Sequence, residues 1–183
     1  MATRTTEDML AEIRRHIDEL EARPRNGTTE TRARLQYRFV RLREEEAAAR
    51  AAVREKAETV DEKVRQLEID ISIAENRLAS EMADDATSFA EAVEAELYDW
   101  DAAIERLQTR VATKAQNARE QAEAEIAALR QARSRAAERL TALPASSDTW
   151  QKQRNRVTEA LDDLERKVRE AALKFESGGE NDN

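Results

Sequence analysis

The side chains in this sequence that could support catalysis or metal binding are a single histidine, His16, and many carboxylates, because the chain has no cysteine. A di-iron centre in a helical bundle needs a Glu-x-x-His motif on each of two helices, and one histidine cannot supply both. A Ser-His-Asp arrangement needs a glycine-rich elbow after a strand, which the three glycines, Gly27, Gly178 and Gly179, do not form. The sequence therefore predicts no enzyme, no cofactor, no metal and no small-molecule substrate.

Carboxylates are concentrated in the middle of the chain, where residues 78–105 contain nine acidic residues and no lysine or arginine. Such a segment is either a solvated helix face or a surface that docks a partner. It does not follow the calcium-loop pattern of spaced acids around a glycine. The acidic residues that we predict for partner docking are Glu81, Asp84, Asp85, Glu91, Glu94, Glu96, Asp99 and Asp101.

Arginines are concentrated in two other segments, 23–43 and 130–156. They either pair with the six acidic residues of 5–22 or bind an external polyanion such as a nucleic acid. The net charge of −8 and the aromatic content of 4% make nucleic-acid binding the less favoured reading. The basic residues that we retain as candidates are Arg32, Arg34, Arg38, Arg41, Arg43, Arg130, Arg133, Arg135 and Arg139.

The composition indicates long helices that position these charged groups, since 38% of residues are charged and there are only three Gly and two Pro. Gly and Pro end helices, and between Thr28 and Leu143 there are none. We predict one elongated helical domain over 1–176 and a disordered tail over 177–183. Its expected helices cover about 5–23, 28–83, 88–143 and 147–176.

A turn at 84–87 would divide the long Gly-free and Pro-free stretch into two equal arms. Ser88 and Glu91 fit a capping box at the start of the second arm. An antiparallel pairing would also place Val64, Leu67, Ile71 and Leu78 opposite Leu107, Ile104, Trp100 and Val93. The predicted fold is all-α: a long antiparallel helical hairpin, or coiled-coil stalk, with the first and last helices forming a four-helix bundle at its open end. An unbroken rod is the alternative.

The function predicted from this architecture is a non-enzymatic coiled-coil scaffold or adaptor in the cytoplasm. It would dock unknown protein partners through its acidic tip and arginine-rich base. It would also form a homodimer, antiparallel or head-to-tail, because apolar residues flanking the stripes, such as Ile73 and Leu129, need cover. The alternative is a helical protein that binds lipid or a membrane surface, and polyanion binding ranks third. In outline, paired long helices resemble phage-shock and ESCRT-III-like hairpins, a likeness of architecture that assigns no site residues.

Overall fold

The computed structural model describes residues 5–23, 29–55, 58–112, 116–143 and 147–177, and these residues form six α-helices and no β-strand. The all-α class predicted from the sequence is therefore confirmed for this part of the chain. The helices are α1 (Thr6–Ala22), α2 (Thr29–Arg54), α3 (Val60–Met82), α4 (Ala86–Ala112), α5 (Gln116–Thr141) and α6 (Ser147–Ser177).

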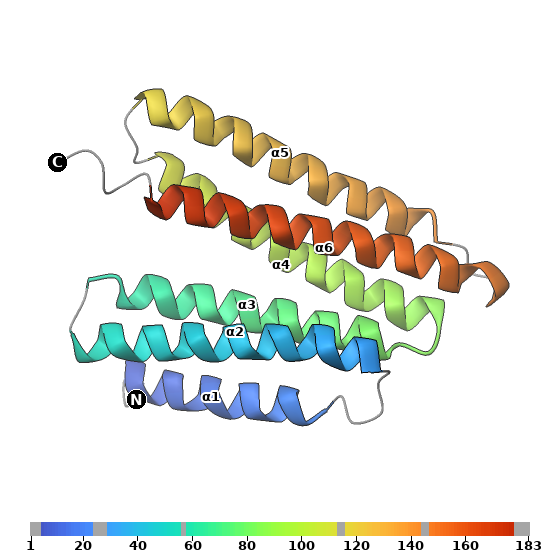
Figure 1. Ribbon diagram of the computed structural model, residues 1–183, viewed down its shortest axis with the longest axis horizontal. Coiled ribbons are helices and arrows are strands. Elements are labelled where there is room, and N and C mark those ends of the chain that lie inside the picture. The colour runs from blue at the N-terminus through green and yellow to red at the C-terminus, as the bar shows by residue number, and fades with distance from the viewer. Residues whose placement is uncertain (1–4, 24–28, 56–57, 113–115, 144–146, 178–183) are drawn as a thin grey trace. The chain divides into compact units, whose positions relative to one another are not determined.

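The chain divides into two units between Ala83 and Asp84. The first unit contains α1, α2 and α3, and the second contains α4, α5 and α6. Within each unit, successive helices run in opposite directions and each helix packs against the other two (Figure 1). Each unit is therefore a three-helix bundle.

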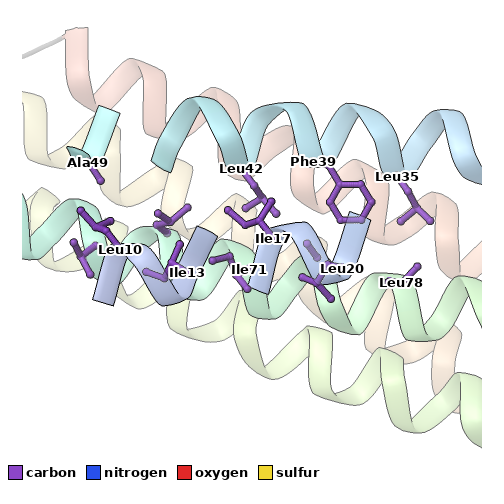
Figure 2. Packing of buried hydrophobic residues seen from close by; sticks show 13 residues of the cluster. Leu10, Ile13, Ile17, Leu20, Leu35, Phe39, Leu42, Ala49, Ile71 and Leu78 are labelled. Atoms are coloured by element: carbon purple, nitrogen blue, oxygen red, sulfur yellow. The ribbon is translucent and has the colours of Figure 1, made fainter. Parts of the chain in front are cut away.

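The first unit begins with a capping box that matches the expected start of its first helix. Thr5 Oγ1 accepts a hydrogen bond from the backbone N–H of Asp8 at 3.2 Å, and the Asp8 carboxylate accepts one from the Thr5 N–H at 3.2 Å. Side chains from α1, α2 and α3 point into one shared core (Figure 2). The buried members of that core are Leu10, Ile13, Ile17, Leu20, Leu35, Phe39, Leu42, Ala49, Val64, Leu67, Ile71, Ala74 and Leu78.

The first predicted arm, 28–83, is not one helix. It is divided into α2 and α3, which pack against each other, and the stripe of Val64, Leu67, Ile71 and Leu78 faces α1 and α2 rather than a second long arm. Interrupting a helix at one point forfeits a few hydrogen bonds of about 1 kcal/mol each. Burying each large aliphatic side chain gains about 1.5–3 kcal/mol. Burial of both stripes within one short bundle therefore outweighs continuity of the helix.

The second predicted arm, 88–143, is also divided, because α4 ends at Ala112 and α5 begins at Gln116. Residues 113–115 lie outside the described residues, while α4 and α5 pack against each other on either side of them. The helix lengths predicted for the long hairpin were thus wrong. The first and last helices, α1 and α6, nevertheless have close to the predicted bounds along the chain. Of the predicted tail, Ser177 is the last residue of α6, and 178–183 are not described.

In the second unit, aromatic residues near the starts of α4 and α6 pack against each other. The rings of Phe89 on α4 and Trp150 on α6 have centroids 6.2 Å apart and are tilted by 50°. The Arg154 guanidinium carbon lies 5.4 Å from the Phe89 centroid and 5.5 Å from that of Trp150, within cation–π range of both. This contact fixes the start of α6 against the start of α4.

The helix break predicted at 84–87 is present, with a different capping residue. Ala83 has an extended backbone, with φ −66° and ψ 129°. Asp85 Oδ1 accepts from the N–H groups of Thr87 at 2.8 Å and Ser88 at 2.9 Å, so Asp85 caps α4. Ser88, predicted to be the cap, instead donates its hydroxyl to Asp85 Oδ2 at 2.9 Å. These hydrogen bonds, those from Ser88 first, lower the pKa of Asp85.

Candidate partner-docking surface

An outward-facing row of acidic residues runs along α4. Glu91, Glu94, Tyr98, Asp101 and Glu105 are spaced three and four apart, which places them on one helix face. All five are exposed, and Tyr98 is the most exposed large hydrophobic side chain described, at 75%. We call these five residues the acidic α4 face.

Most carboxylates of this face have no cation partner in the part of the chain that the structure describes. Asp101 Oδ2 lies 2.7 Å from Arg133 Nη2 of α5. Among the described residues, none forms an ion pair with Glu91, Glu94 or Glu105. The face therefore carries negative charge that the described residues of the second unit do not neutralise.

Glu96 was predicted to belong to the docking surface, and its position excludes it. Its side chain is fully buried, and its Oε1 accepts a hydrogen bond of 3.1 Å from the indole Nε1 of Trp100, which is also buried. A carboxylate costs several kcal/mol to bury, so it must be paired or hydrogen-bonded. Glu96 therefore contributes to the interior of the fold and not to a surface.

The remaining predicted acidic residues have several different environments. Glu81 lies on α3, in the first unit. Asp84 is exposed, Asp85 caps α4, and Asp99 is half-buried and already has an interaction partner. Of the residues predicted for the acidic tip, three lie on the acidic α4 face: Glu91, Glu94 and Asp101.

The predicted basic residues lie on α2 and α5, and most are occupied within their own unit. Arg41 pairs with Glu45 at 2.7 Å, and Arg130 donates to the side-chain oxygen of Gln108 at 2.5 Å. Arg43 and Arg133 pair with acids, Arg139 donates to the Arg156 carbonyl at 2.8 Å, and Arg38 also has an interaction partner. Arg135 is exposed. The side chains of Arg32 and Arg34 lie outside the described residues.

Arg43 shows how the first helix neutralises the basic segment. Its Nη2 lies 2.7 Å from Asp18 Oδ1 and 2.5 Å from Glu21 Oε2, both on α1. The hydrogen bonds that Arg43 donates to Glu21 and Asp18 raise the pKa of its guanidinium. Pairing with the acids of 5–22 is therefore realised at this arginine, which reduces what α2 can offer to an external polyanion.

A pair of carboxyl groups joins α2 and α3. Burial, and then the charge of Glu45, raise the pKa of Asp70 to about 8. Gln66 Nε2 donates a hydrogen bond to Asp70 Oδ2 at 3.1 Å, and Arg41 forms an ion pair with Glu45. At neutral pH Asp70 is therefore protonated beside Glu45. Nothing in the composition of the sequence pointed to this pair.

His16 lies at a groove of about 300 Å³ between α1 and α3, to which Ile13 and Ile71 contribute apolar lining. Its Nε2 is 3.4 Å from Glu75 Oε2, and Arg23 Nη1 is 3.3 Å from Glu75 Oε1. In the part of the chain that the structure describes, no three His, Asp or Glu side chains gather as metal ligands would. None of the described helices is long and apolar enough to cross a membrane.

Compared with known proteins, the chain matches no family model, no curated protein and no solved structure.

Proposed function

We propose that this protein is a non-enzymatic helical scaffold or adaptor that binds a basic segment of a protein partner through the acidic α4 face. The observation that carries the proposal is the combination of exposed Glu91, Glu94 and Glu105, without ion-pair partners among the described residues, around the exposed ring of Tyr98. A cytoplasmic location goes with this proposal and stays a prediction.

The spacing of this face suits a helical partner. Groups three and four residues apart on α4 match arginines or lysines at the same spacing on a second helix. Each exposed ion pair contributes at most about 1 kcal/mol, so charge would mainly set the partner's orientation and speed of association. Tyr98 would supply the apolar contact, because tyrosine combines a large ring with a hydroxyl and is common at binding hot spots.

Polyanion binding has less support. Arg41, Arg43, Arg130 and Arg133 are each engaged by side chains of their own unit. A polyanion would have to displace these contacts before it gained its own.

The test uses a synthetic amphipathic peptide with arginines at positions i, i+4 and i+7 and one leucine between them, titrated into the full chain in a calorimeter. We expect binding that weakens as salt rises, since the Debye length falls from about 10 Å at 0.1 M to about 3 Å at 1 M. The double variant Glu91→Lys, Glu94→Lys should lose it. Equal binding by this variant and the original chain would overturn the proposal.

A matched control separates the acidic α4 face from the overall charge. The double variant Glu120→Lys, Glu138→Lys makes the same charge change at exposed positions of α5, in the same unit. It should retain peptide binding. If both double variants lose binding equally, the effect belongs to net charge and the docking face is rejected.

A further inference from the structure

The helix α2 carries a second stripe on its exposed side, in addition to the one that enters the core. Its inner stripe contains the buried Leu35, Phe39 and Leu42. The residues of the outer stripe are Ala33, Tyr37, Val40, Glu44, Ala47 and Ala51, all exposed. We call this set the outer α2 face.

The outer α2 face has the spacing of a coiled-coil seam. Its positions are separated alternately by four and three residues, which is the heptad rule for two helices that pack along each other. The outward side of a surface helix is usually polar or charged. Here it contains Tyr37, 56% exposed, and Val40, 50% exposed, and Glu44 is its one charged member.

The sizes of these residues point to a second copy of the chain in the antiparallel direction. The first half of the face is bulky, with Tyr37 and Val40, and the second half is small, with Ala47 and Ala51. A parallel pair would place tyrosine against tyrosine and leave alanine against alanine. An antiparallel pair places Tyr37 against Ala47, Ala33 against Ala51 and Val40 against Glu44, so that each tyrosine ring faces an alanine of the other copy.

Charge selects the same direction. Among the described residues Glu44 has no ion-pair partner. In a parallel pair the two Glu44 side chains would oppose each other directly, which is destabilising. In the antiparallel register each Glu44 lies opposite Val40 of the other copy, so the two carboxylates do not oppose each other.

We infer that the outer α2 face is a self-association surface, on which a second copy of this chain packs its own α2 in the antiparallel direction. The inference is independent of the acidic α4 face, which lies in the other unit. From Ala33 to Ala51 the seam is about 27 Å long at 1.5 Å per residue. One helix on each side makes a small interface, so we expect a weak dimer that forms at about 10–100 µM chain.

The mass of the full chain tests the association. Sedimentation equilibrium should show a monomer–dimer equilibrium, and Val40→Lys should raise its dissociation constant at least about tenfold without lowering the melting temperature, because Val40 is exposed. Leu173→Lys, at an exposed leucine of α6, is the matched control and should leave the dimer intact. A monomeric mass up to about 200 µM, or a dimer indifferent to Val40→Lys, would overturn the inference.

Disulfide trapping tests the direction, and it is clean because the chain has no cysteine of its own. Ala33→Cys and Ala51→Cys are made as separate variants of different tag length, mixed and oxidised slowly. The antiparallel seam predicts mixed 33–51 dimers in preference to 33–33 and 51–51 dimers. Preference for the two like pairs would mean a parallel dimer and would contradict the inference.

Peptide binding by the acidic α4 face and dimer formation through the outer α2 face can be tested independently. Glu91→Lys with Glu94→Lys should abolish peptide binding and leave the dimer unchanged, whereas Val40→Lys should weaken the dimer and leave peptide binding unchanged. If either variant affects both measurements, the two surfaces are not independent and the account of the outer α2 face is wrong.

Discussion

The indole N–H of Trp100 donates a 3.1 Å hydrogen bond to the carboxylate of Glu96, one helical turn earlier on α4, and both side chains are buried. Trp100→Phe keeps most of the ring and removes the donor, so the free energy of unfolding should fall by roughly 1–3 kcal/mol. The measurement is urea denaturation. Trp150→Phe changes a buried tryptophan whose indole makes no such bond to a described residue, so it should lose less, and equal losses would contradict the role of this bond.

The carboxyl pair between α2 and α3 predicts a pH-dependent stability. Folded Asp70 keeps its proton up to about pH 8, whereas in the unfolded chain an aspartate loses it near pH 3.9. Stability conferred by the protonated group is therefore present at low pH and is lost as pH rises toward 8, by at most about 1.4 kcal/mol per pH unit.

Asp70→Asn should remove this dependence, because asparagine stays neutral beside Glu45. Its stability relative to the original chain should increase from pH 5 to pH 9 in urea denaturation. Glu68→Gln, at an exposed carboxylate of α3, serves as the control and should leave the profile unchanged. Parallel pH profiles for Asp70→Asn and the original chain would show that Asp70 is ionised in the fold.

The hydrogen bonds at the start of α4 predict which of two substitutions, at Asp85 or at Ser88, destabilises the protein more. Asp85 accepts from two backbone N–H groups, while Ser88 only supports Asp85. Asp85→Ala should therefore lower the urea midpoint more than Ser88→Ala does. The Asp85 contribution should also disappear as pH falls through the lowered pKa of Asp85. The reverse order would restore Ser88 as the cap.

The division of the first predicted arm can be tested by a distance. Spin labels at Glu44 on α2 and Glu68 on α3 should lie within about 20 Å, because neighbouring helix axes are about 8–10 Å apart. On one continuous helix the same positions would be about 36 Å apart at 1.5 Å per residue. Labelled chain is diluted with unlabelled chain, so that only distances within one chain are measured.

The sequence predicted the features that depend on local patterns. The first helix over about 5–23 and the loss of helix near Asp84 were predicted from helix-ending residues and from side chains that bond to nearby backbone. It did not predict the turn between α2 and α3, where there is neither Gly nor Pro. Thr59 followed three residues later by Glu62 fits the capping-box pattern and could have indicated the start of α3. In the structure, however, the Thr59 side chain makes no capping hydrogen bond.

Predictions that depended on tertiary contacts were less successful. Glu96 was assigned to the surface because of its charge, yet it lies three residues after Val93 and four before Trp100, within the buried stripe. Ile73 and Leu129, expected to need a second chain for cover, are already buried in the single chain. The Asp70 and Glu45 pair requires two helices to meet, which periodicity alone does not specify.

The most direct test of the central claim is a ¹⁵N NMR titration of the full chain with the arginine-bearing peptide. The account predicts that amide shifts change along the acidic α4 face, at Glu91, Glu94, Tyr98, Asp101 and Glu105, and that Tyr98→Ala reduces them. Shift changes concentrated on other helices, or none while calorimetry reports binding, would contradict a docking site on α4.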